Sequence, residues 1–201
     1  MRHRILRRFS HTFFLFRAVP YGVMELFDAA AEAINRHFNF RKVRISSGAA
    51  NAARINGDEL FLALNVKDPF VAEPSYAALV AVRETYRAMY GREGFPADIL
   101  ADKSVIRDGM GKELAGYYFF LLTERKNRHA ATLREFVEIN LPHLSFAGMD
   151  NAQADIFRDI AETFSAPEGA KKKTERLFLL CRDPYRNYDE MKKEADEICK
   201  S

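Results

Sequence analysis

Residues 78–92 read ALVAVRETYRAMYGR and form the clearest amphipathic segment of this 201-residue chain. The apolar side chains that would share one face of a helix are Leu79, Val82, Tyr86 and Met89. Their spacing of three and four residues is typical of a helix that packs one face on a core. Arg83 and Arg87 lie one turn apart beside that face, and Gly91 is a helix terminator. This segment therefore predicts a helix with an apolar face and a basic flank.

The same periodicity recurs on both sides of this stretch. Phe95-Pro96 leads into a predicted long helix whose apolar stripe runs from Ile99 to Leu121. Gly109 and Gly111 are interpreted as positions of close packing on that helix. A third predicted helix, residues 133–141, ends before Pro142, because proline breaks helix interiors. These three helices make up a predicted core of residues 76–141.

The flanking regions are also predicted to be helical. In residues 21–75 a first helix spans Met24 to Phe38 and ends near Phe40, and turn signals at residues 46–48 and 56–57 follow. Periodicity does not decide whether residues 58–64 form a strand or a helix, and the helical neighbours favour a helix. In residues 142–201 one helix begins at Asp150 or Asn151, and the last begins near Pro184. The predicted fold class is all-α.

The N-terminal segment, residues 1–20, carries a concentrated positive charge. It contains five arginines, and no acidic residue occurs before Glu25. Of 31 basic residues in the chain, 26 then remain against 28 acidic ones. The composition, with interspersed apolar residues, serine and threonine, is that of a mitochondrial transit peptide. The alternative is a basic arm that lies on a partner. The slightly acidic body argues against nucleic-acid binding, which needs a sustained basic face.

The remaining patterns do not indicate catalysis. Cys181 and Cys199 lack the spacing of a metal or redox motif, so a disulfide framework is not expected. The five histidines are scattered, and no serine stands in a Gly-x-Ser-x-Gly motif. No apolar run approaches the roughly 18 residues that a membrane span requires. We therefore expect a non-catalytic protein without a metal, a cofactor of its own or a transmembrane segment.

One local pattern resembles a known family. Thr85-Tyr86-Arg87 on the first helix is followed by Phe95-Pro96 and, on the next helix, by Ile106-Arg107-Asp108-Gly109-Met110. This order is similar to that of the LYR-motif family, small mitochondrial three-helix proteins that act as accessory subunits or assembly factors. The sequence of residues 82–90 is especially similar to that of the complex I LYR-like subunit. Two positions depart from the family pattern, with threonine in place of leucine at 85 and methionine in place of phenylalanine at 110.

The resemblance covers about residues 76–141 and implies an antiparallel three-helix bundle there, with extra N- and C-terminal helices on either side. It also implies a partner and a set of contact residues. The implied partner is mitochondrial acyl carrier protein, whose acidic helix would meet basic residues and whose acyl-phosphopantetheine would enter the bundle. The implied partner-binding residues are Arg83, Tyr86, Arg87, Lys103 and Arg107. The implied lining of the acyl chain or core is Leu79, Met89, Phe95 and Met110. The function implied is that of an accessory or assembly subunit of a respiratory complex in the mitochondrial matrix or on the matrix side of the inner membrane.

An alternative interpretation keeps the mitochondrial location without carrier binding. The chain would then be a helical structural subunit of another assembly, such as the mitoribosome or the ATP synthase. In both cases we expect exposed apolar surface on the isolated chain. The two interpretations differ in whether an acyl carrier protein co-purifies with the chain, which a phosphopantetheine mass would reveal.

Overall fold

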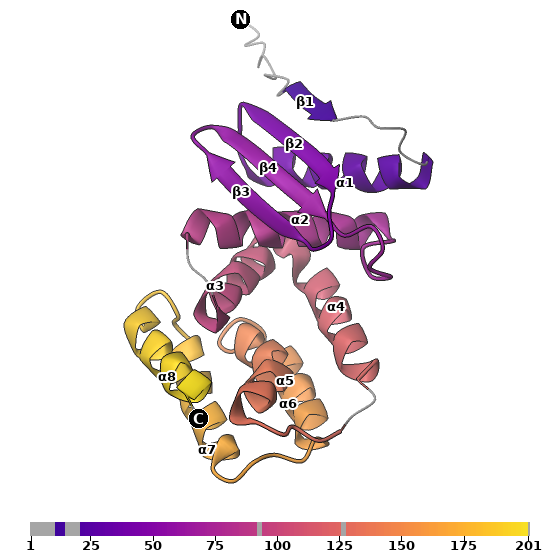
Figure 1. Ribbon diagram of the computed structural model, residues 1–201. Coiled ribbons are helices and arrows are strands. Elements are labelled where there is room, and N and C mark those ends of the chain that lie inside the picture. The colour runs from indigo at the N-terminus through magenta and orange to yellow at the C-terminus, as the bar shows by residue number, and fades with distance from the viewer. Residues whose placement is uncertain (1–10, 15–20, 92–93, 126–127, 201) are drawn as a thin grey trace, which may run out of the picture. The chain divides into compact units, whose positions relative to one another are not determined.

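The computed structural model describes residues 11–14, 21–91, 94–125 and 128–200, and the chain is mostly helical. It divides into two compact units, residues 1–89 and residues 90–201. The elements of each unit are shown in Figure 1. Residues 1–10 and 15–20 of the transit-like segment lie outside the described residues.

The prediction of a mostly helical chain is confirmed, but the first unit contains a sheet, so the fold is not purely all-α. The strands are β1 (His11–Phe14), β2 (Lys42–Ser47), β3 (Ala52–Asn56) and β4 (Glu59–Leu64), in the order β1-β2-β4-β3. β2 is parallel to β1 and to β4, whereas β3 and β4 form an antiparallel hairpin. Gly57, at φ 59°, opens the two-residue loop of that hairpin. The turn signal at residues 56–57 therefore marks a hairpin.

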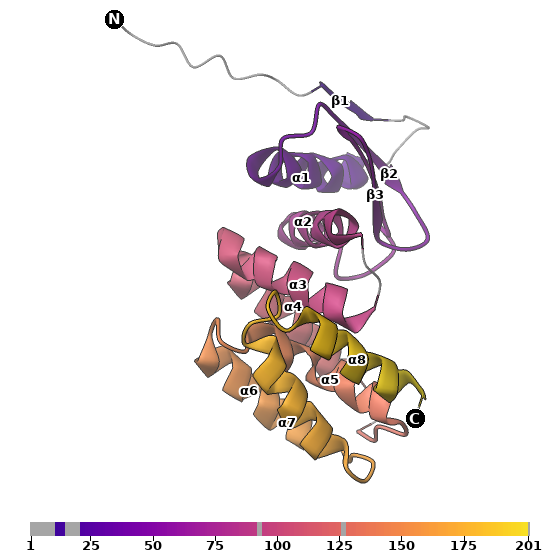
Figure 2. The same ribbon diagram turned by 90° about the vertical axis from the view of Figure 1, so that its left-hand side faces the viewer.

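Two helices, α1 (Tyr21–His37) and α2 (Pro74–Tyr90), cover the same face of this sheet, as Figure 2 shows. Alternate side chains of the central strands are buried, namely Val43 and Ile45 of β2 and Leu60, Leu62 and Leu64 of β4. This period-two burial is what one covered sheet face requires. It also explains why the preference for a helix at residues 58–64 was wrong. β4 is held by pairing with β2 and β3, which the local sequence does not show.

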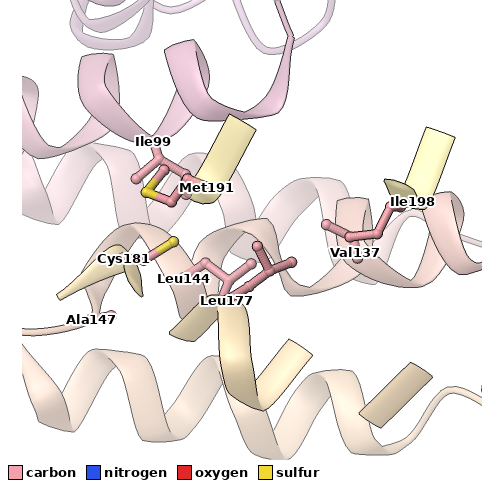
Figure 3. Packing of buried hydrophobic residues seen from close by; sticks show 8 residues of the cluster. All are labelled: Ile99, Val137, Leu144, Ala147, Leu177, Cys181, Met191 and Ile198. Carbon is pink, nitrogen blue, oxygen red and sulfur yellow. The ribbon is translucent and has the colours of Figure 1, made fainter. Parts of the chain in front are cut away.

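The second unit is helical and is built around α5. Its elements are α3 (Phe95–Val105), a π-helical segment η1 (Ile106–Met110), α4 (Gly111–Thr123), α5 (Leu133–Phe146), α6 (Asn151–Glu162), α7 (Ala170–Cys181) and α8 (Tyr188–Lys200). α5 contacts α3, α4, α6, α7 and α8. Ile99, Leu144, Leu177 and Met191 belong to its buried apolar core, which Figure 3 shows. Asp150 caps α6 as predicted, because its carboxylate accepts the backbone N–H of Gln153 at 3.1 Å.

Two predicted helix boundaries in this unit were wrong. The predicted long helix from Ile99 to Leu121 is interrupted at Gly109, whose φ is 88°. No heavy atom lies within 4 Å of a Cβ built at Gly109, so its role is conformational rather than close packing. Helix α5 continues through Pro142 to Phe146. A proline inside a helix costs about 3 kcal/mol, and burial of Leu144 and Phe146 contributes roughly 1.5–3 kcal/mol each.

Candidate functional site

The residues implied by the family resemblance fall in both units. Leu79, Arg83, Tyr86, Arg87 and Met89 belong to the first unit, and Phe95, Lys103, Arg107 and Met110 belong to the second. Each group is therefore described within its own unit.

On α2, the side chains of the predicted face have different environments. Leu79 is completely buried, whereas Met89 is 54% exposed. The Tyr86 ring is half-buried and packs edge-on against Phe38, with ring centroids 4.9 Å apart. Tyr86 therefore helps to hold α2 against the segment that follows α1.

The two arginines of α2 contact an acid on their own helix. Glu84 is buried, and both of its carboxylate oxygens accept from Nη1 of Arg87 at 3.0 Å. Nη1 of Arg83 lies 3.7 Å from the same carboxylate, and Arg83 is only 9% exposed. Arg87 keeps a third of its side chain exposed. Of this pair, Arg87 is the one that a partner can reach.

Lys103 lies inside the second unit. Its Nζ donates to the carbonyl oxygens of Ser145 at 3.2 Å and Ala147 at 2.5 Å, at the C-terminal end of α5. Burial lowers the pKa of Lys103 to about 8, and nearby acidic groups oppose the change. A lysine in this position satisfies helix-end carbonyls that would otherwise lack partners. Its 3% exposure leaves little for an incoming protein to contact.

Arg107 is exposed and belongs to a small polar cluster. Its guanidinium lies over the ring of Tyr185 at 5.9 Å, and its Nη2 donates to Oγ of Ser104 at 3.4 Å. The hydroxyls of Tyr90, Ser104 and Tyr185 lie within hydrogen-bond distance of one another, at 2.6–3.1 Å. Phe95 and Met110 are half-buried, and Phe95 packs against the core around α5.

A polar network that the sequence did not indicate ties α3 to α4 and α5. Asp102 is completely buried, and its Oδ2 accepts from the hydroxyl of Tyr118 and from Oγ of Ser145. The two residues that follow Asp102 are also hydrogen-bonded, Lys103 to the end of α5 and Ser104 to the carbonyl oxygen of Leu100 and the hydroxyl of Tyr185. These hydrogen bonds account for the burial of three adjacent polar side chains, which therefore have a structural role.

The strongest candidate for an interaction site is the exposed side of α4. Only Leu114, Tyr118 and Leu122 of this helix are buried, which is a single narrow strip. Phe119 is 54% exposed and Leu121 is 41% exposed, while Tyr117 and Phe120 are half-buried. We call the side chains of Tyr117, Phe119, Phe120 and Leu121 the α4 surface. In Figure 1, α4 lies on the opposite side of α5 and α6 from α7 and α8.

A hollow flanks the α4 surface on each side. One, of about 360 Å³, lies between α4 and α6 and is lined by Phe119, Ile160 and other residues. The other, of about 410 Å³, lies between α4 and α5 and is lined by Leu121, Ile139 and other residues. Because successive residues of a helix are about 100° apart, Phe119 and Leu121 lie on opposite flanks. The sequence signal for this surface was the apolar run of residues 117–122. Six consecutive residues of a helix point to all of its sides, so some of these apolar side chains must lie outside the buried strip.

The described residues provide no other obvious chemistry. Among them, no group of three or more His, Cys, Asp or Glu side chains could hold a metal ion. Within the described part of the chain, no helix has the length and apolar character needed to cross a bilayer. Cys181 is a buried free thiol whose pKa is raised by burial to about 12. No protein-family model, curated protein or solved structure matches this chain.

Proposed function

We propose that this protein is a non-catalytic accessory or assembly subunit that binds a partner protein through the α4 surface. The observation that supports this most directly is the pair of exposed side chains, Phe119 and Leu121, each beside a hollow. Aromatic residues that are exposed next to concave surface are typical of protein-binding sites. The partner would insert apolar groups into the hollows and cover α4.

The partner we propose is mitochondrial acyl carrier protein, in a respiratory complex of the matrix side. The identity of this partner rests on the LYR-like pattern of residues 85–110. The charge around α4 suits an acidic partner, because exposed cations stand at both ends of the helix, with Glu124 as the exposed acid among them. These cations are Arg107, Lys112, Arg125 and Arg128. The apolar hollow between α4 and α5 would receive the acyl chain.

The structure favours a smaller set of contact residues than the resemblance implies. Arg107 is exposed and adjoins the start of α4, so it stays in the set. Arg87 stays as a partly exposed cation of the first unit. Arg83 and Lys103 contact buried groups within their own units, and we assign them a structural role in place of a partner-binding one.

The test measures binding of the purified chain to purified acyl carrier protein that carries an octanoyl-phosphopantetheine group. We expect Phe119→Ser and Arg107→Glu each to weaken the complex at least tenfold. The matched control is Leu179→Ser, because Leu179 is 62% exposed but lies on α7. It should leave the affinity unchanged.

Two outcomes would contradict the proposal at different levels. In the first, the carrier does not bind, and the chain instead captures a mitoribosome or ATP synthase subunit in a way that depends on Phe119. This would refute the carrier as the partner but support the α4 surface as the binding site. In the second, the carrier binds, but neither Phe119→Ser nor Arg107→Glu weakens the complex. This would support the carrier as the partner and refute the α4 surface as the binding site.

A further inference from the structure

A second concave site lies on the second unit, away from the α4 surface. It is a cavity of about 340 Å³ between α5, α6 and α7. This volume is in the range of pockets that hold small organic molecules. Its floor is polar and buried, since Asn140, His143 and Thr174 are each 4–6% exposed. Phe136 and Phe178 supply apolar walls. A cavity with buried polar groups between aromatic walls suits a ligand that is partly apolar and partly polar.

The hydrogen bonds of His143 fix the chemistry of its ring. Nδ1 lies 2.8 Å from the carbonyl oxygen of Ala154, and a carbonyl can only accept, so Nδ1 carries the proton. The ring also stacks on Phe178, with centroids 4.3 Å apart and planes within 4°. Burial lowers the pKa of His143, which keeps the imidazole neutral at neutral pH. Nε2 is then a hydrogen-bond acceptor.

The other two polar groups of the floor also retain accepting atoms. Nδ2 of Asn140 donates to the carbonyl of Phe136 at 2.8 Å, which leaves Oδ1 as an acceptor. Oγ1 of Thr174 donates to the carbonyl of Ala170 at 3.0 Å and keeps its lone pairs. The floor therefore offers three acceptors from three different side chains. Its complement is a ligand that is rich in hydrogen-bond donors.

Charged residues at the rim support the same polarity. Glu162 and Glu175 line the cavity, together with Arg158 and Lys171. Arg158 is already paired, because its guanidinium lies 3.0 Å from Asp155 and 3.7 Å from Asp159. With Arg158 engaged by these two acids, Glu162 and Glu175 face Lys171 as the remaining charged residues of the lining, and a ligand that brings a positive charge would be favoured.

We propose that this cavity binds a small organic cation, a primary ammonium group on an aromatic body. The ammonium group has three donors, which match the acceptors of Asn140, His143 and Thr174. The aromatic body packs between Phe136 and Phe178, where it also gains stacking contacts. This site is separate from the proposed carrier surface, and neither proposal depends on the other.

The test compares three probes of nearly equal shape, 2-phenylethylamine, 2-phenylethanol and phenylacetate, by calorimetric titration of the full chain. We expect the amine to bind at least tenfold more tightly than the alcohol, because hydrogen bonds to a charged donor are stronger. Phenylacetate should bind most weakly. Equal affinities, a preference for phenylacetate, or no binding by the amine would each overturn the proposal.

Two variants locate the binding within the molecule. Thr174→Val preserves shape and removes one acceptor, and we expect it to weaken binding of the amine about three- to tenfold. Thr123→Val is the matched control, because Thr123 lies on α4 outside this cavity. His143→Phe keeps a ring to stack on Phe178 but lacks Nε2, and it should also lose affinity. If His143→Phe does not fold, Thr174→Val and the comparison of the three probes still test the proposal. Unchanged affinity in Thr174→Val would refute the site.

Discussion

Replacing Lys103 with methionine should flatten the pH dependence of stability between about pH 8 and pH 10.5. Burial lowers the pKa of Lys103 from 10.5 to about 8 in the folded protein. Between these values the unfolded chain binds a proton that the folded protein does not. Stability therefore rises with pH across this interval and falls as the pH drops towards the folded pKa. At about 1.4 kcal/mol for each pH unit, the full rise is about 3 kcal/mol.

The neutral amine can keep both of its contacts. It still has two N–H groups, enough to donate to the carbonyl oxygens of Ser145 and Ala147. Deprotonation thus removes a costly buried charge without breaking the cap of α5. Methionine fills similar space but cannot titrate, and it leaves the two carbonyls without this donor. We therefore predict a change in the slope of stability against pH, whatever happens to its absolute value.

The assay is urea unfolding followed by circular dichroism, from about pH 7.5 to about pH 10.5. Cys181 acts in the opposite direction above about pH 9, because burial raises its pKa to about 12. Lys103 opposes that rise, so the slopes of the two proteins are compared below about pH 9. Lys193→Met is the control, since Lys193 is exposed on α8. Parallel curves for the wild type and Lys103→Met would show that the reasoning about Lys103 is wrong.

Three further substitutions or modifications test local features of the fold. Gly109→Ala should lower the free energy of unfolding by about 1–2 kcal/mol because φ at Gly109 is 88°. Gly111→Ala, two residues on at φ −63°, should be neutral or stabilising by up to about 1 kcal/mol; equal effects in thermal melts would contradict this. Glu84→Gln should cost about 1–3 kcal/mol through loss of the contacts with Arg87, and an unchanged urea midpoint would argue against it. In a Cys199→Ser background, alkylation of Cys181 should be far slower than in urea, and equal rates would disprove its burial.

Helices whose signals are local were the part of the fold that the sequence predicted best. The apolar period of residues 24–38 matches α1, and the capping side chain of Asp150 matches the start of α6. Both signals act within a few residues, so one sequence is enough to detect them. The sheet is different, because β2 and β4 are parallel neighbours that β3 separates along the chain. No residue within β4 records that pairing, and a short apolar run fits a helix equally well.

The N-terminal segment illustrates a conflict between two interpretations of the same residues. Arginine-rich, apolar composition is typical of a transit peptide, yet residues 11–14 form β1 and pair with β2. A protein cleaved near residue 20 would lack β1, and the sheet order would become β2-β4-β3. The edge of β2 would then be open to another strand. The composition of a segment can be typical of a targeting signal and still say nothing about strand pairing. The composition of residues 1–20 therefore did not predict that residues 11–14 pair with β2.

The helix of residues 78–92 shows why a candidate site is harder to predict than a helix. Its periodicity correctly identified α2 and its buried Leu79. The basic flank suggested a surface for an acidic partner, but Glu84 is one residue from Arg83 and three from Arg87. A residue three positions away lies within reach on a helix, and an acid there competes with any external carboxylate. Whether an arginine serves the fold or a partner thus depends on burial of that acid, a tertiary property. Arg107 instead lies over the ring of Tyr185 and donates to Ser104, and it is exposed next to α4, where we propose that a partner binds.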